Sequence, residues 1–92
     1  MAERKKTRNA DRDIVSDDMR TALSVIVERD GRISQSALVH ELPFDRIKAE
    51  YVIDSLQSYK FVYLERAGSA NAQTVVLADR GKKWAVDEGL AT

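Results

Sequence analysis

The stretch SALVHELPFDRIKAEYVIDSLQSYKFVYLER, which runs from Ser36 to Arg66, holds two helical patterns around one proline and then changes to the alternation of a strand. Pro43 lacks an N–H and biases Leu42 away from the helical region, so the first pattern ends there. In the second pattern the apolar residues recur at helical spacing: Ala49, Val52, Ile53 and Leu56. Asp45 is a candidate N-cap, and we therefore expect a helix over about residues 45–59.

The residues after this helix predict a hairpin. The segment FVYLERA (61–67) alternates and is rich in aromatic and β-branched residues, as strands are. A turn cluster, GSANA (68–72), separates it from a return strand in QTVVLA (73–78). Because a lone hairpin is marginally stable in water, we expect this one to pack against the helices.

Upstream, the sequence predicts two more helices and a short strand. Ser16 is a candidate N-cap, and the apolar residues after it recur at helical spacing: Met19, Ala22, Leu23, Ile26 and Val27. This helix should end near Asp30-Gly31, because glycine is the usual residue just after a helix. We expect Ile33 to pair as a short strand and Ser34 to cap the next helix. The apolar face of that helix holds Ala37, Leu38 and Leu42.

The C-terminal segment DRGKKWAVDEGL predicts a last helix over about residues 79–88, although Gly81 near its start disfavours it. The predicted order is therefore helix, short strand, helix, helix, strand, strand, helix. This is an α+β arrangement in which helices and a covering hairpin share one small core. We place it in residues 16–92, after an arm of residues 1–15 that shows no periodicity and is expected to be flexible.

Composition excludes several classes of function. The 92 residues contain no cysteine, so disulfides, thiolate metal sites and a cysteine nucleophile are excluded. The only histidine, His40, cannot form a metal site alone, and no phosphate-binding glycine motif occurs. We therefore expect no enzyme activity, no metal and no cofactor. No apolar run approaches the roughly 20 residues that span a bilayer, and no secretory signal is present, so a cytoplasmic location is expected.

Charge is distributed unevenly along the chain. Residues 1–12 hold five basic and two acidic residues, whereas the remaining 80 hold ten basic and thirteen acidic residues. A basic arm therefore precedes a mildly acidic domain, although the formal net charge is zero. Basic arms often contact nucleic acid, and the alternative is a solvated tail that aids solubility. The basic residues of the arm that we consider for DNA binding are Arg4, Lys5, Lys6 and Arg8.

Over roughly residues 18–86 the chain resembles the winged helix-turn-helix family, including MarR-like and PadR-like bacterial regulators. The resemblance lies in apolar positions that match the core of that family: Leu38, Leu42, Phe44, Ala49, Ile53, Leu56, Phe61 and Val62. The segment KFV (60–62) stands where the family has G-L-V, with Lys60 in place of the usual glycine. LADRGKKW (77–84) is similar to the family's L-T-x-x-G-x-x segment, with Ala78 in place of threonine, so that Asp79 would have to cap the last helix.

The resemblance implies double-stranded DNA as the partner and a role in transcriptional regulation. The recognition helix, about residues 45–59, would enter the major groove, and residues 61–78 would form the wing. The residues implied to contact DNA are Ser34, Gln35, Ser36, Arg46, Lys48, Glu50, Tyr51 and Arg66. Whether Ile47 also faces outward depends on the phase of the helix. The resemblance also implies a homodimer, for which we expect exposed apolar residues on the first and last helices: Leu23, Val27, Trp84 and Leu90.

An alternative function is a winged-helix module that binds another protein without binding DNA. The acidic balance of residues 13–92, the uncharged wing tip at residues 68–72 and the carboxylate of Glu50 favour this alternative. A DNA-binding module predicts a continuous positive strip that joins Arg46, Lys48 and Arg66 to the arm. A protein-binding module predicts an exposed apolar patch. A second basic cluster, formed by Arg80, Lys82 and Lys83, is expected to be solubilising. Trp84 is expected to pack on the first helix or in a dimer interface rather than to stack on bases.

Overall fold

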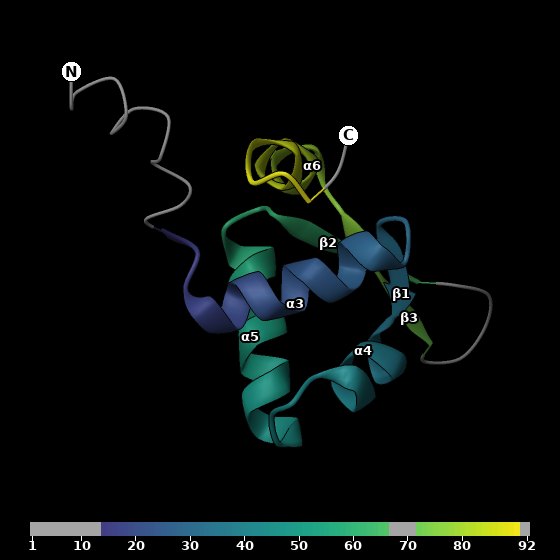
Figure 1. The fold of residues 1–92 in the computed structure, drawn as a ribbon. Coiled ribbons are helices and arrows are strands. Elements are labelled where there is room, and N and C mark those ends of the chain that lie inside the picture. The colour runs from purple at the N-terminus through teal and green to yellow at the C-terminus, as the bar shows by residue number, and fades with distance from the viewer. Residues whose placement is uncertain (1–13, 67–71, 91–92) are drawn as a thin grey trace.

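The computed structural model describes residues 14–66 and 72–90. This part of the chain is an α+β structure with four helices and a small antiparallel sheet (Figure 1). In chain order the elements are α3 (Asp17–Glu28), β1 (Arg32–Ser34), α4 (Gln35–Glu41), α5 (Arg46–Ser58), β2 (Val62–Arg66), β3 (Gln73–Leu77) and α6 (Asp79–Asp87). The predicted order of helices and strands is confirmed.

The three strands lie in the order β1-β3-β2, and both pairings are antiparallel. Val75 pairs with Ile33 on one side and with Leu64 on the other, and this row faces the helices. On the opposite face of the sheet, Arg32 and Glu65 form an ion pair between the two outer strands. The hydrogen bond that Arg32 donates to Glu65 is the main cause that raises the pKa of Arg32 above its ordinary value, and the negative charge of Glu65 is the second.

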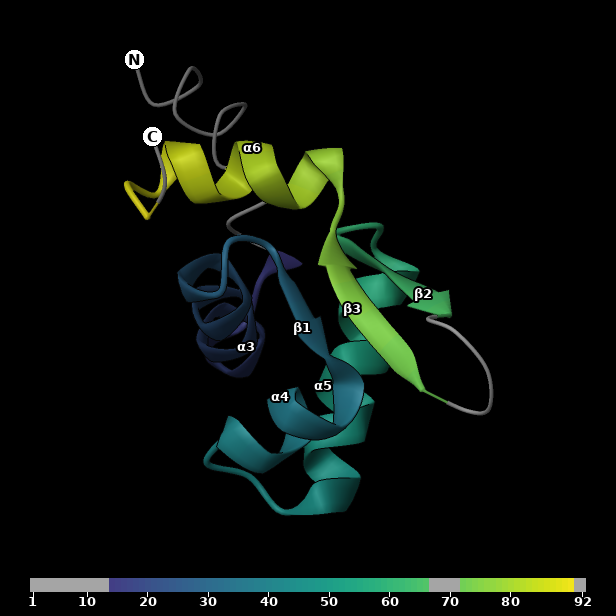
Figure 2. The same cartoon turned by 90° about the vertical axis from the view of Figure 1, so that its right-hand side faces the viewer.

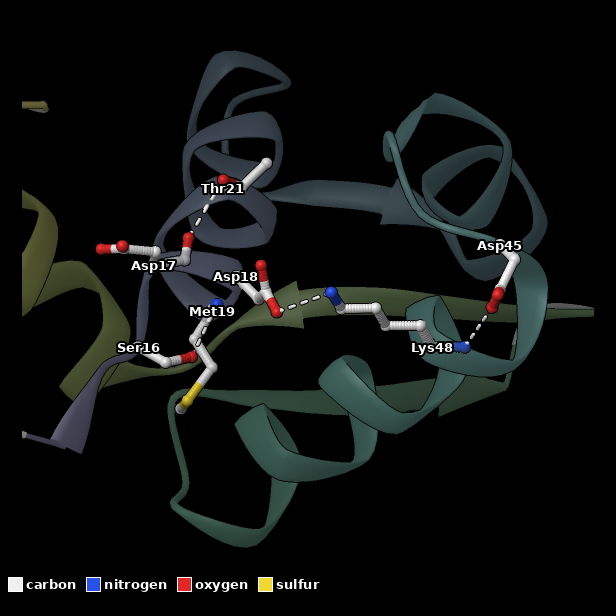
Figure 3. Close-up of polar contacts among 7 residues, drawn as sticks. All are labelled: Ser16, Asp17, Asp18, Met19, Thr21, Asp45 and Lys48. Carbon is white, nitrogen blue, oxygen red and sulfur yellow. Dashed lines mark hydrogen bonds and ion pairs between the residues drawn. The ribbon is translucent and has the colours of Figure 1, made fainter.

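Side chains cap three of the helices as the sequence predicted. The hydroxyl of Ser16 accepts from the N–H of Met19 at 3.2 Å, and Ser34 caps α4 in the same way. The carboxylate of Asp45 accepts from the N–H of Lys48 at 2.8 Å (Figure 3). Helix α6 differs, because its N-cap is Ala78 and no side chain bonds there. The expectation that Asp79 caps α6 was wrong; Asp79 is its first residue, where the helix macrodipole favours an acid.

Helices α3, α5 and α6 end in the same backbone arrangement, in which the residue after the C-cap is left-handed. These residues are Asp30 (φ 62°), Lys60 (φ 69°) and Gly89 (φ 77°). After α5, the N–H of Phe61 donates to the carbonyl of Leu56 and that of Lys60 to Gln57, which is a Schellman motif. Lys60 thus holds a left-handed conformation that favours glycine, and the helix exit at Lys60 is tight.

The core draws apolar side chains from all four helices and the sheet. Its largest fully buried side chains are Phe61, Leu23, Ile26, Leu38, Ile53, Leu56, Val62 and Val75. Ile14 and Val15, which the sequence assigned to the flexible arm, are half-buried against this core. The packed part of the chain therefore begins before Ser16.

The core also corrects the predicted dimer surface. Leu23 is fully buried and Trp84 is only 2 % exposed, so neither side chain is available to a second copy of the chain. Trp84 packs against α3, where the guanidinium of Arg20 lies 5.5 Å from the centre of its ring. Helix α6 packs against α3, and both side chains belong to the core that the helices share with the sheet. Among the described residues of α6 and its exit, Val86 and Leu90 are the exposed large apolar side chains.

Gly81 allows α6 to approach the end of the sheet closely. A Cβ atom at this position would lie 2.3 Å from the carbonyl oxygen of Phe61 and 2.7 Å from Leu77. Helix α6 therefore sits at the end of the molecule opposite α4 and against the exit of α5 (Figures 1 and 2). In the described residues, no helix is both long and apolar enough to cross a membrane.

Candidate nucleic-acid interface

A groove of about 470 Å³ opens where the first turns of α4 and α5 face the start of β3. Its lining residues are Ser34, Gln35, Ser36, Val39, His40, Arg46, Glu50, Ala72 and Gln73. Five of the eight domain residues that the sequence assigned to DNA contact are among them: Ser34, Gln35, Ser36, Arg46 and Glu50. They come from two helices separated by the Pro43 turn, and the fold brings them to one place.

Ser34 connects the sheet to this groove. It is the last residue of β1, where it pairs with Thr74, and it is also the N-cap of α4. Its hydroxyl accepts from the N–H of Ala37 at 3.2 Å, which fixes the start of the helix. The register of the sheet thus determines where Gln35 and Ser36 enter the groove.

Among the described residues that line the groove, Arg46 is the one with a guanidinium. Its side chain is 82 % exposed, and its Nε lies 3.2 Å from a carboxylate oxygen of Glu50, one turn further along α5. An exposed ion pair at this spacing contributes only about 0.3–0.5 kcal/mol. A guanidinium has five N–H donors, and this contact uses one of them, so the others can reach a ligand anion.

Lys48 lies outside the groove, on the side of α5 that faces α3. Its ammonium is 3.2 Å from a carboxylate oxygen of Asp18, and it lies 5.0 Å from the centre of the Phe44 ring (Figure 3). Two helical positions correspond to about 200° around a helix, which explains why Arg46 and Lys48 point to opposite sides. The continuous positive strip that a DNA-binding module predicts is therefore not formed by these two residues.

The outward face of α5 is apolar between those two cations. Ile47 is 81 % exposed and Tyr51, one turn later, is 71 % exposed. This settles the phase of the helix, and Ile47 faces outward together with Tyr51. Lys48 and Glu50 are exposed as predicted, whereas the opposite face of α5 packs into the core through Ala49, Val52, Ile53 and Leu56.

Arg66 lies beside the groove but does not line it. It pairs with Gln73 across the hairpin, and strand alternation places both side chains on the sheet face turned towards the helices. Gln73 and Ala72 form the hairpin side of the groove. The rest of the wing tip (67–71) and the basic arm residues Arg4, Lys5, Lys6 and Arg8 lie outside the described residues.

The sequence did not single out Val39, His40 or Gln73 as groove residues. A signal existed on α4, because Ser36, Val39 and His40 follow the i, i+3, i+4 spacing that puts side chains on one helix face. In the described residues, no group of three or more histidine, cysteine or acidic side chains can hold a metal ion. His40 is one of the residues that line the groove.

The second basic cluster is remote from the groove. Arg80 donates to the carbonyl oxygen of Tyr59 at 2.7 Å, and its guanidinium lies 4.8 Å from the centre of the Phe61 ring. Arg80 thus links α6 to the residues that follow α5. Lys82 and Lys83 are exposed on α6, at the opposite end of the molecule from α4 (Figure 2).

The arrangement offers a groove of mixed lining beside an apolar helix face. Its described lining includes the guanidinium of Arg46, the carboxylate of Glu50 and several hydroxyl and amide groups among apolar side-chain surface. Such a groove can accept an anionic backbone, and the helix face can contact flat or methylated surfaces. No protein-family model, no curated protein and no solved structure matches this chain significantly.

Proposed function

We propose that the chain is a small winged-helix DNA-binding protein that acts as a transcriptional regulator in the cytoplasm. In this assignment α4 and α5 form the helix-turn-helix, α5 enters the major groove, and the β2–β3 hairpin is the wing. The observation that supports it most directly is the groove itself, since five residues implied by the family resemblance line one concave surface.

The groove fits the phosphate backbone beside the recognition helix. Arg46 would donate to a phosphate or to a guanine edge, and the side chains of Ser36 and Gln35 would donate to neighbouring phosphate oxygens. The phosphate contacts among these position the protein without reading sequence. Phosphate neutralisation makes such binding salt-dependent, with a slope of about one unit per contact.

Regulation would follow from occupancy of a promoter by a symmetric dimer on a pseudo-palindromic site. Because Leu23 and Trp84 are buried, the apolar residues left for a dimer of α3 and α6 are half-buried Val27 and exposed Val86 and Leu90. Sedimentation of the free chain at micromolar concentration tests this part of the proposal separately from DNA binding.

The experiment that tests the proposed function is a fluorescence anisotropy titration of a labelled mixed-sequence duplex at low and at physiological salt. We expect micromolar or tighter binding at low salt, and a shallower salt slope for Arg46→Ala. Lys82→Ala is the matched control, because it removes the same charge from the far end of the molecule. If the parent protein does not bind even at low salt, the proposed function is wrong.

A second candidate is the protein-binding module, and the exposed pair Ile47 and Tyr51 favours it. Carboxylates also surround the recognition helix, with Asp18 on Lys48 and Glu50 on Arg46. Absence of duplex binding in the titration above, with an intact fold, would leave this candidate as the better assignment.

A further inference from the structure

The apolar pair on α5 is the most exposed large hydrophobic surface in the described part of the chain. Ile47 and Tyr51 are 81 % and 71 % exposed, and the next such residue, Val86 on α6, is 51 % exposed. The pair adjoins the groove directly, because Arg46 precedes Ile47 and Glu50 precedes Tyr51. Any ligand that fills the groove and follows α5 must therefore also contact these two side chains.

The charges around this pair disfavour readout of guanine by hydrogen bonds. The guanidinium of Arg46 faces the carboxylate of Glu50, and the ammonium of Lys48 faces Asp18. Each cation already has a carboxylate neighbour that partly offsets its charge, which reduces its net gain from a base or a phosphate. Apolar contact has no such offset, so Ile47 and Tyr51 are the side chains of α5 with the most to gain from a base edge.

In the major groove, the apolar feature of a base edge is the C5-methyl group of thymine. Side chains one helical turn apart have Cβ atoms about 5–6 Å from each other. Successive bases of one strand rise by about 3.4 Å. The spacing of Ile47 and Tyr51 therefore matches methyl groups that are one or two base steps apart.

We propose that Ile47 and Tyr51 determine specificity by contacting thymine methyl groups, so that the target class is duplex DNA with closely spaced thymines in the major groove. This inference rests on the proposed DNA-binding function. Arg46 and the α4 side of the groove supply phosphate contacts, and Ile47 and Tyr51 supply the preference among sequences. Burial of one methyl group corresponds to about a fourfold change in affinity.

The test begins with enrichment of binding sites from a random duplex library by the full chain. Each thymine of an enriched site is then replaced by deoxyuracil, which removes the C5-methyl group and leaves charge and hydrogen bonding unchanged. We expect roughly fourfold weaker binding at each of one or two thymines and little change at the others. Binding is measured for the parent, Ile47→Ala, Tyr51→Ala, Tyr51→Phe and Val86→Ala.

Ile47→Ala should lose the difference between thymine and deoxyuracil at one position while it keeps the salt slope set by phosphate contacts. Tyr51→Phe, which keeps the ring, should keep the discrimination. Val86→Ala is the control for removal of an exposed apolar side chain elsewhere, and it should behave as the parent. Because positions 47, 51 and 86 are exposed, thermal unfolding of all variants should match the parent.

Failure of the inference and failure of the proposed function give different results. If an enriched site binds equally well with deoxyuracil throughout, or if duplexes bind without any enriched sequence, thymine readout is wrong and DNA binding stands. Discrimination that survives in Ile47→Ala and in Tyr51→Ala also overturns the assignment to these residues. If no duplex binds, both ideas fall, and the apolar pair belongs to an interface with a protein.

Discussion

The ammonium of Lys48 on α5 lies 3.2 Å from a carboxylate oxygen of Asp18 on α3, and it joins the candidate recognition helix to the first turn of the domain. Both side chains are about half exposed, with 51 % and 42 % of their surfaces accessible. A pair of this kind adds about 0–1 kcal/mol to stability. The pair has a larger effect on the proposed DNA binding, because Asp18 partly neutralises the ammonium of Lys48 that would otherwise contact a phosphate.

Asp18→Asn should therefore strengthen duplex binding about two- to fivefold at low salt, since Lys48 is released and a negative charge beside the DNA is lost. Asp17→Asn is the matched control. Asp17 belongs to the same helical turn, but its carboxylate points away from Lys48 (Figure 3). Anisotropy titrations of both variants measure the difference, and equal gains in the two would contradict a specific role for Asp18.

Gly81→Ala should lower the free energy of unfolding by about 1–3 kcal/mol, the usual range for overpacking. The added Cβ would overlap the carbonyl oxygen of Phe61, which is backbone and cannot move aside. Gly89→Ala is the comparison, because no atom lies within 4 Å of the added group there. Its cost should come only from the left-handed backbone, about 1–2 kcal/mol. Urea unfolding measures the free energy of unfolding of both variants. Amide exchange distinguishes them, because we expect α6 to detach from the sheet only in Gly81→Ala.

Lys60→Gly should stabilise the protein by about 0.5–1 kcal/mol. Lys60 has a positive φ of 69°. Glycine adopts this conformation without the cost of about 1–2 kcal/mol that other residues bear. Glycine also raises the entropy of the unfolded chain, which offsets part of that gain. Asp30→Gly should gain less, because aspartate tolerates the left-handed region better than lysine. Thermal unfolding of the two variants checks the order, and a destabilised Lys60→Gly would contradict the assigned strain.

Trp84→Phe should destabilise the protein much less than Trp84→Ala, which should cost about 3–5 kcal/mol. The indole N–H of Trp84 is buried, and no group of the described residues accepts a hydrogen bond from it. Phenylalanine removes that donor. Relief of the desolvation penalty, about 1–3 kcal/mol, offsets part of the lost packing. Chemical denaturation of both variants measures this, and a similar loss in the two would mean that packing alone determines the cost.

The order of the elements was predictable because local chemistry determines it. Ser16, Ser34 and Asp45 bond to N–H groups three residues ahead, and Pro43 prevents continuation of α4, so each boundary is encoded within a few residues. The core faces followed from helical and strand periodicity in the same way. The low helix propensity of Gly81 argued against the last helix. The close packing that this glycine permits outweighs that propensity.

The relationships between elements were not predictable from the same patterns. Burial of Trp84 depends on the packing of α6 against α3, and periodicity does not report which helices pack together. The partner of Lys48 is 30 positions away in sequence, so the neutralisation of this cation could not be read from α5 alone. Helical phase did contain one missed signal, since positions 46 and 48 cannot share a side of a helix.

The pairing of Ser34 with Thr74 has a consequence for the order of events in folding. These residues are far apart in the chain, and β1 joins the sheet only through β3, so the groove forms after a long-range contact has closed. A state with β1 detached keeps the helices but loses one wall of the groove. A ligand in the groove would consequently protect the amides of β1 against hydrogen exchange. The affinity of the ligand would fall as the fraction of molecules with β1 detached rises.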